Sequence, residues 1–457
     1  MTDVLYDMFI IFVLLLAGVI LRKYVKFFQT FHIPAALIGG LLGLFLGPQM
    51  LGAVAPVHFP IPDSIGRLPG VMICFVLGLA LLSGTEQPRN MSRTAVAHCF
   101  NAAQAWQFQL WVGLVIAYFC GLFWDIPIGA GFSGIMGFFQ GHGNAAAFGT
   151  ALTDVTGWED AKDFCITIAT TGLLTGIFFG IVMINIALRK GWTQVRELPA
   201  GNPDAAIIKT GLVPAGKRNP IGYGVTSADS LDPLAFQLTI PFIIYGVASV
   251  IRTFFVANKV FFLSNLPTFV YCMLLGILLN VVLKRTRLNT YLDDATLHRI
   301  SGVCMEILVC AAMASLSIKV VMAYAVPLLL LTFAFVLVNL VSCFGIAYMT
   351  YDTNWFECGV GGYGNFSGVM ATGLMLVRTC DPAGETIGTK VTAAGGASSY
   401  IYTLPYIALG AIWSVSFSPG ILIGVTFALW VVLMLIIRSR FWIKERKFSD
   451  LFTDNMV

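Results

Sequence analysis

The sequence has little charge: Asp, Glu, Lys and Arg make up only 11% of its 457 residues, against roughly 25% in ordinary globular proteins. Hydrophobic residues make up 58% of the chain, and apolar runs of about 18 to 25 residues recur along it. Each run is long enough to cross a bilayer as a helix. The composition excludes a set of soluble domains and predicts an all-α polytopic membrane protein. A transmembrane β-barrel needs alternating polarity, which is missing.

Motifs of common enzymes are missing as well. The ten cysteines stand singly in apolar runs, without a C-x-x-C pair or a Cys/His spacing typical of a metal site, so we expect small buried hydrophobes. There is no G-x-x-x-x-G-K-[ST] phosphate loop, and the net charge of +4 is spread over helix ends. The sequence therefore predicts no enzyme activity, no cofactor and no nucleic-acid partner.

About eleven spanning helices are expected from the apolar runs. We interpret the first run as a retained helix because no basic leader precedes it. With the N-terminus outside, the cytoplasmic segments hold most of the 27 Lys and Arg residues, as the positive-inside rule requires. This predicts a multi-pass protein of the inner (plasma) membrane with a cytoplasmic C-terminus. The predicted spans lie near residues 4–21, 34–54, 66–83, 95–120, 164–187, 236–255, 262–283, 301–318, 324–348, 387–413 and 418–437.

Two further apolar segments are interrupted by glycines and are not simple spans. Residues 127–153 and 355–377 are each predicted to form a re-entrant hairpin that enters and leaves on one side of the membrane. The first hairpin would open outward and the second toward the cytoplasm. Together these features predict two inverted five-helix repeats and an extra C-terminal helix. The boundaries are 1–190 for repeat 1, 191–234 for a cytoplasmic linker, 235–413 for repeat 2, and 414–457 for the extra helix and basic tail.

A G-x-G-N string occurs at matching places in the two hairpins, as Gly141-His142-Gly143-Asn144 and Gly362-Tyr363-Gly364-Asn365. Backbone groups freed at such a tip are costly in a bilayer unless they line a wet cavity or hold a ligand. A helix that starts after the tip presents its N–H groups to a carboxylate, whereas unwound carbonyls and Asn side chains suit Na⁺. The alternative is that the glycines only permit close helix packing.

The candidate ligands come from the hairpins and the helices that follow them. His142 is open to three roles: substrate binding, proton relay, or a hydrogen bond to the opposite hairpin. Thr and Ser hydroxyls on the following spans either complete a cation site or bond the preceding helical turn. The predicted substrate-binding residues are Gly141, His142, Gly143, Asn144, Gly362, Tyr363, Gly364, Asn365, Ser367 and Arg378, and the predicted Na⁺ ligands are Asn144, Thr171, Asn365, Ser398 and Ser399.

Other predicted spans also carry polar residues. Asn101, Gln104 and Gln107 share one face of their predicted helix and are expected to look into the bundle. Glu306 is the clearest carboxylate within a predicted span, but it lies near the cytoplasmic end, where an interfacial role is equally consistent.

The chain resembles the sodium/glutamate symporter family. The resemblance rests on Gly141-His142-Gly143 in the first hairpin, the glycine-rich second hairpin, Ile33-Pro34 with Gly39-Gly40, and the string Leu266-Pro267-Thr268-Phe269-Val270. The family implies two inverted five-helix repeats, glutamate uptake driven by Na⁺, and a homodimer.

Three functions remain open at this stage. The first is Na⁺-coupled symport of glutamate or a related small carboxylate by alternating access. The second is a carrier for another small organic anion, coupled to protons through His142. The third is an ion channel with two re-entrant pore loops, which is disfavoured because opposed single-copy hairpins suit a midplane binding site better than a filter.

Overall fold

A computed structural model describes residues 2–30, 33–80, 82, 92–193, 220, 222–227, 229–258, 260, 263, 266, 268–381 and 385–451. Every regular element in these ranges is helical. Eight of the described helices are long and apolar enough to cross a bilayer, and three other predicted spans coincide with helices α5, α6 and α18. The prediction of an all-α polytopic membrane protein is confirmed. Much of the linker, residues 194–219, lies outside the described ranges.

The chain divides into two compact units, each built from two separate stretches of sequence. Unit 1 comprises Met1–Glu86 and Pro203–Ile318. Within it α3 packs on α1 and α12, while α5 packs on α11 and α12. Its helices are α1 (Thr2–Tyr24), α2 (Lys26–Thr30), α3 (Ala35–Leu46), α4 (Leu51–Val54), η1 (Asp63–Arg67), α5 (Leu68–Ala80), α10 (Pro233–Ala257), α11 (Thr268–Thr286), η6 (Leu288–Tyr291) and α12 (Asp294–Ala314).

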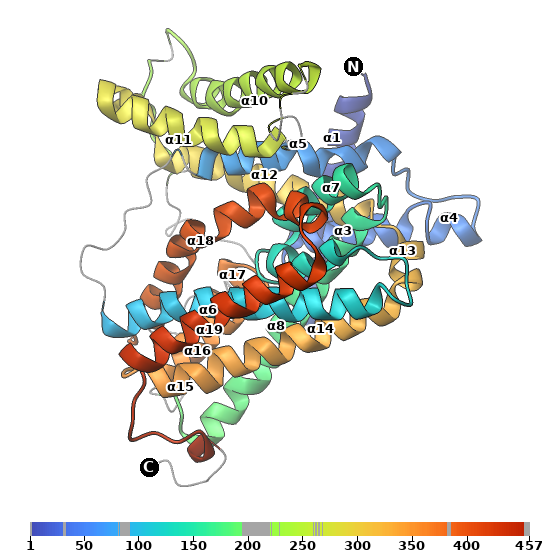
Figure 1. Ribbon diagram of the computed structural model, residues 1–457. Coiled ribbons are helices and arrows are strands. Elements are labelled where there is room, and N and C mark those ends of the chain that lie inside the picture. Colours follow the sequence, from blue (N-terminus) through green and yellow to red (C-terminus); the bar gives the residue numbers. More distant parts are fainter. Residues whose placement is uncertain are drawn as a thin grey trace. The chain divides into compact units, whose positions relative to one another are not determined.

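Unit 2 comprises Gln87–Asn202 and Lys319–Val457 and contains both glycine-rich segments. In it α14 and α19 pack against α6, and the three run side by side in Figure 1. Its helices are α6 (Arg93–Cys120), η2 (Ile128–Phe132), η3 (Gly134–Phe138), α7 (His142–Thr156), α8 (Ala161–Lys190), α13 (Ile318–Ala323), α14 (Ala325–Leu340), η7 (Val341–Ile346), α15 (Ala347–Thr350), α16 (Trp355–Phe366), α17 (Met370–Cys380), α18 (Gly388–Ser416), α19 (Pro419–Arg440) and η8 (Phe448–Leu451).

The expected interruption of the second segment at Gly361–Asn365 is wrong, because these residues lie inside the continuous helix α16. Their glycines face close neighbours instead. A Cβ at Gly361 would meet the hydroxyl of Thr392 in α18, and a Cβ on Gly364 would lie 2.8 Å from the backbone of Gly373 in α17. The alternative weighed from the sequence, that glycines permit close helix packing, holds for α16.

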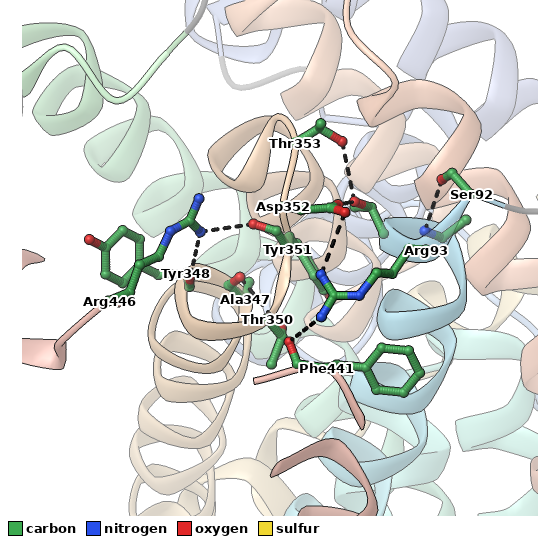
Figure 2. Close-up of polar contacts among 12 residues, drawn as sticks. Ser92, Arg93, Ala347, Tyr348, Thr350, Tyr351, Asp352, Thr353, Phe441 and Arg446 are labelled. Atoms are coloured by element: carbon green, nitrogen blue, oxygen red, sulfur yellow. Dashed lines mark hydrogen bonds and ion pairs between the residues drawn. The ribbon is translucent and has the colours of Figure 1, made fainter. Parts of the chain in front are cut away.

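The chain after α19 folds back onto the turn that leads into α16 (Figure 2). The guanidinium of Arg446 donates hydrogen bonds to the carbonyls of Tyr348 (2.6 Å) and Tyr351 (2.8 Å) and lies over the Tyr348 ring, 5.0 Å from its centroid. Arg93 reaches the same turn, where it pairs with Asp352 at 3.5 Å and donates to the carbonyl of Phe441 at 3.1 Å. The start of α16 is thereby tied to α6 and to the C-terminal segment.

We predict that Gly373→Ala destabilises unit 2 while Gly424→Ala does not. A Cβ at Gly373 would clash with the carbonyl oxygen of Gly361, so a helix must move, which costs about 1–3 kcal/mol. Nothing lies within 4 Å of a Cβ at Gly424 in α19, where alanine is the better helix former by about 1 kcal/mol. Thermal unfolding of the purified variants measures both. Equal midpoints for the two variants would contradict the packing role.

A second prediction concerns the stability of the protein at acidic pH. Partial burial acts to raise the pKa of the Asp352 carboxyl, but hydrogen bonds from Thr94 and Arg93 outweigh it and hold the pKa below the ordinary 3.8. A carboxyl with a lowered folded-state pKa contributes stability above pH 3.8, and this is lost as the pH falls through the folded value. The unfolding midpoint of Asp352→Asn should therefore fall less on acidification below pH 3.8 than that of the wild type. The exposed Asp229→Asn serves as control and should follow the wild type.

Candidate functional site

The first glycine-rich segment is a broken helix whose break lies at Gly141. An arm of irregular helix, η2 followed by η3, ends at Phe138, and α7 begins at His142. Gly141 adopts φ 78° and ψ −173°, a conformation that residues with a Cβ rarely take. Its N–H still donates to the carbonyl of Gly137 at 2.7 Å, and its own carbonyl accepts from Ala145 at 3.1 Å. The break predicted at this glycine is present.

Glycines let the arm of this segment lie directly on neighbouring backbones. A Cβ at Gly131 would fall 2.6 Å from the backbone of Gly113 in α6, and one at Gly137 would fall 2.8 Å from the carbonyl of Cys165 in α8. The arm is therefore held between two long helices, which fixes the position of the break that follows it.

The second glycine-rich segment breaks after Phe366, where α16 ends. Ser367, Gly368 and Val369 separate it from α17, and Val369 is fully extended with φ −146° and ψ 164°. Ser367 is completely buried, whereas the side chain of Val369 is 38% exposed. The break thus lies just beyond the G-x-G-N string.

The two breaks touch each other. A Cβ at Gly141 would lie 2.6 Å from the side chain of Val369 and 3.4 Å from the carbonyl of Gly368. The rings of Phe139 and Phe366, one beside each break, stack at 4.7 Å with an interplanar angle of 13°. The first turns of α7 and α17 consequently start at one place inside unit 2.

Helix α8 supplies a small-residue surface beneath the second break. A Cβ at Gly172 would lie 2.9 Å from the carbonyl of Ser367, and one at Gly176 would lie 2.9 Å from the Ser367 side chain. These glycines therefore allow the break to sit directly on α8. The same helix presents Thr170 to the first break.

Polar side chains cluster at the start of α7. His142 is 6% exposed, and its Nε2 lies 3.0 Å from the hydroxyl of Thr170. The amide nitrogen of Asn144 donates to the Oε1 of Gln140 at 2.6 Å. The Oδ1 of Asn144 is buried and accepts no hydrogen bond within the described part of the chain. A buried acceptor of this kind is costly unless a ligand or an ordered water meets it.

The ends of three helices determine the electrostatic potential at the two breaks. The N-termini of α7 and α17 carry partial positive charge and unpaired N–H groups, whereas the C-terminus of α16 carries partial negative charge. Such an arrangement favours an anion beside the first two and a cation beside the third.

The structure brings together only part of the predicted site. Gly141, His142, Gly143, Asn144 and Ser367 lie at the two breaks, and Gly364 and Asn365 lie in the last turn of α16.

Several other predicted residues face elsewhere. Gly362 faces His98, and the Tyr363 hydroxyl points to the carbonyl of Thr175. Thr171 bonds the hydroxyl of Thr332 in α14 at 2.9 Å. Arg378 is exposed in the last turn of α17, the end away from the break, and Ser399 lies within α18. The side chain of Ser398 lies outside the described ones.

Two buried amides that the sequence did not single out support the second break. Gln109 in α6 and Asn339 in α14 are completely buried, and both donate to the last carbonyl of α16, that of Phe366, at 3.1 and 2.8 Å. Asn339 is the one strongly polar residue in the apolar run of α14, and this feature of the sequence could have identified it. Gln109 comes two residues after Gln107, the last of the polar residues that were expected to face inward from α6.

The expected polar face of α6 is confirmed as an inward-facing network. Asn101, Gln104 and Gln107 are buried. Asn101 donates to the Tyr351 hydroxyl at 2.9 Å and accepts from Gln104 at 2.8 Å. Tyr351 also bonds Nδ1 of the fully buried His98 at 2.9 Å. This histidine thus belongs to the packing around α16.

Comparison with protein families supports the earlier resemblance. The family model of the sodium/glutamate symporters matches residues 1–372, which include unit 1, the first break and the second break. No curated protein matches the chain. The match covers most of the sequence and ends within the first turn of α17, before α18, α19 and the C-terminal segment. The chain therefore belongs to the sodium/glutamate symporter family.

Proposed function

We propose that this membrane protein is a secondary active transporter that couples the uptake of glutamate, or a related small carboxylate, to Na⁺ by alternating access. The meeting of the two helix breaks at Gly141 and Val369 is the observation that carries this proposal. It supplies, within one unit, N–H groups for an anion and oxygen atoms for a cation. No cofactor takes part, and Na⁺ is the coupling ion.

The substrate carboxylate would bind the first turns of α7 and α17. Helix N-termini are suited to carboxylates because their first N–H groups lack helical partners and carry partial positive charge. His142 and Asn144 stand in the first turn of α7, where their side chains can contact the substrate or an ion bound beside it. The buried Oδ1 of Asn144 suits Na⁺, a hard cation that prefers oxygen.

We further propose that the two broken segments are re-entrant hairpins in two inverted repeats. Each half of the chain runs in the same order: three predicted spans in unit 1, then a long helix, a broken segment and another long helix in unit 2. In the first half the unit 2 part is α6, the segment that breaks at Gly141, and α8. In the second half it is α14, the pair α16 and α17, and α18. Helix α19 would lie outside the repeats.

The setting follows from charge and family. If most Lys and Arg residues lie on the cytoplasmic side of the inner membrane, the N-terminus lies outside and the C-terminus lies in the cytoplasm. A homodimer is the assembly we expect for a member of this family.

The main test is uptake into proteoliposomes. An inward Na⁺ gradient should drive accumulation of labelled glutamate, and replacing Na⁺ by choline at constant pH should abolish it. In parallel, thermal unfolding of the purified protein should shift upward with glutamate only when Na⁺ is present, since a ligand at 100 times its Kd adds about 2.7 kcal/mol. Accumulation that persists undiminished in choline would contradict Na⁺ coupling. If another carboxylate stabilises the protein and glutamate does not, that carboxylate replaces glutamate as the proposed substrate.

Proton coupling through His142 is the second candidate, because the Nε2 of this buried imidazole lies 3.0 Å from a hydroxyl, that of Thr170. The variant His142→Gln separates the two, because a Gln amide reaches the position of Nε2 but does not titrate. Under Na⁺ coupling, we expect His142→Gln to keep Na⁺-driven accumulation with a raised KM for glutamate. Coupling to protons would instead be favoured if a pH gradient drives accumulation by the wild type and His142→Gln loses that accumulation entirely.

A further inference from the structure

The last carbonyl of α16 accepts hydrogen bonds from two side-chain amides. Asn339 donates through Nδ2 to the carbonyl of Phe366 at 2.8 Å and also lies 2.9 Å from the hydroxyl of Ser367. Gln109 donates to the same carbonyl at 3.1 Å and to the Oδ1 of Asn339 at 2.6 Å. Two side chains from different helices are thus linked to each other, to the last residue of α16 and to the first residue of the break.

This arrangement ties the break to the long helices α6 and α14. A carbonyl at a helix C-terminus lacks an intrahelical donor, and in a bilayer water does not replace it. The side-chain amides supply that donor from fixed positions, because both are completely buried in packed helices. The residues Phe366 and Ser367 are therefore held by hydrogen bonds of defined direction, in addition to apolar packing.

The position of Phe366 also sets the relation between the two breaks. Its ring stacks on Phe139, which precedes the first break, and three residues later Val369 lies against Gly141. A shift of the α16 end would consequently move the second break relative to the first turn of α7. The hydrogen bonds of the amides to the break go to Phe366 and Ser367 and not to the first turns of α7 and α17, so the amides would act on the carboxylate site through this backbone.

We propose that Gln109 and Asn339 are positioning residues for transport: they hold the second break against the first so that the starts of α7 and α17 form one binding site. This inference rests on the proposed function, because it assigns the binding site to the two breaks. It predicts an effect on substrate affinity that mere loss of packing would not produce.

The chain offers a matched control on the same helix. Gln104 is as fully buried as Gln109, donates to Asn101 at 2.8 Å and accepts from the indole of Trp430 at 3.1 Å. None of these contacts involves either break. Removing the amide of Gln104 therefore disturbs a comparable buried network while leaving both hydrogen bonds to the Phe366 carbonyl in place.

The experiment compares Asn339→Leu, Gln109→Met and Gln104→Leu in Na⁺-driven glutamate uptake and in thermal unfolding. We expect Asn339→Leu to raise the KM for glutamate about tenfold, because both bonds to the break are lost. Gln109→Met should raise KM by a smaller factor, since Asn339 still donates to Phe366. Gln104→Leu should lower the unfolding midpoint with KM unchanged.

A labelling experiment reads the position of the break without transport. Val369→Cys places a thiol at the exposed side of the second break, in a background whose ten native cysteines are buried apart from the partly buried Cys99. Combined with Asn339→Leu or Gln109→Met, its reaction rate with a maleimide should change several-fold, whereas Gln104→Leu should leave it unchanged. The milder Gln109→Met keeps the test open if Asn339→Leu does not fold.

The outcomes separate the two proposals. Absence of Na⁺-driven glutamate uptake by the wild type would contradict the proposed function, and the labelling rates would still decide the positioning role. If the wild type transports while Asn339→Leu and Gln109→Met keep the wild-type KM and labelling rate, the positioning role is wrong and the amides only stabilise the fold.

Discussion

Unit 2 depends on one constraint: where a helix is broken in the buried interior of a protein, the freed backbone groups must find partners within the protein. The chain breaks at Gly141 and again between Ser367 and Val369. Both breaks are enclosed by α6, α8 and α14, which contribute glycines for close approach or amides for hydrogen bonds. The amides of Gln109 and Asn339 and the glycines of α8 at positions 172 and 176 meet this requirement at the second break.

The two breaks meet the constraint in different ways. At the first, Gly141 turns the chain with a positive φ and keeps both of its backbone hydrogen bonds within its own segment. At the second, no glycine takes a positive φ, and the end of α16 depends on Gln109 and Asn339. The first break is therefore largely set by local sequence, whereas the second is set by tertiary contacts. The conformation of α16 and α17 is for that reason more sensitive to substitutions elsewhere in unit 2.

This difference explains how far the sequence could predict the structure. Apolar run length predicted the helices, and the tight turn at Gly141 was predicted because only glycine suits it. The same reasoning failed for Gly361–Asn365. A single sequence does not distinguish a glycine needed for a turn from a glycine needed for close packing of a neighbouring helix. Which applies depends on Thr392 and Gly373, which the fold brings against α16. The role of Phe366 depends likewise on side chains from distant spans.

The breaks also differ in the side chains that they present, and this bears on how the two halves would share recognition. The first turn of α7 carries His142 and Asn144, whereas α17 begins with Met370 and Ala371 before the buried Thr372. In the proposed site, α17 would offer backbone N–H groups, which favour any carboxylate, and one small polar side chain in its first turn, Thr372. Discrimination among carboxylates needs side chains of particular reach and hydrogen-bonding character. The first break is therefore where substrate selectivity would be set, and the second, held by its two amides, is where the geometry of that selection would be maintained.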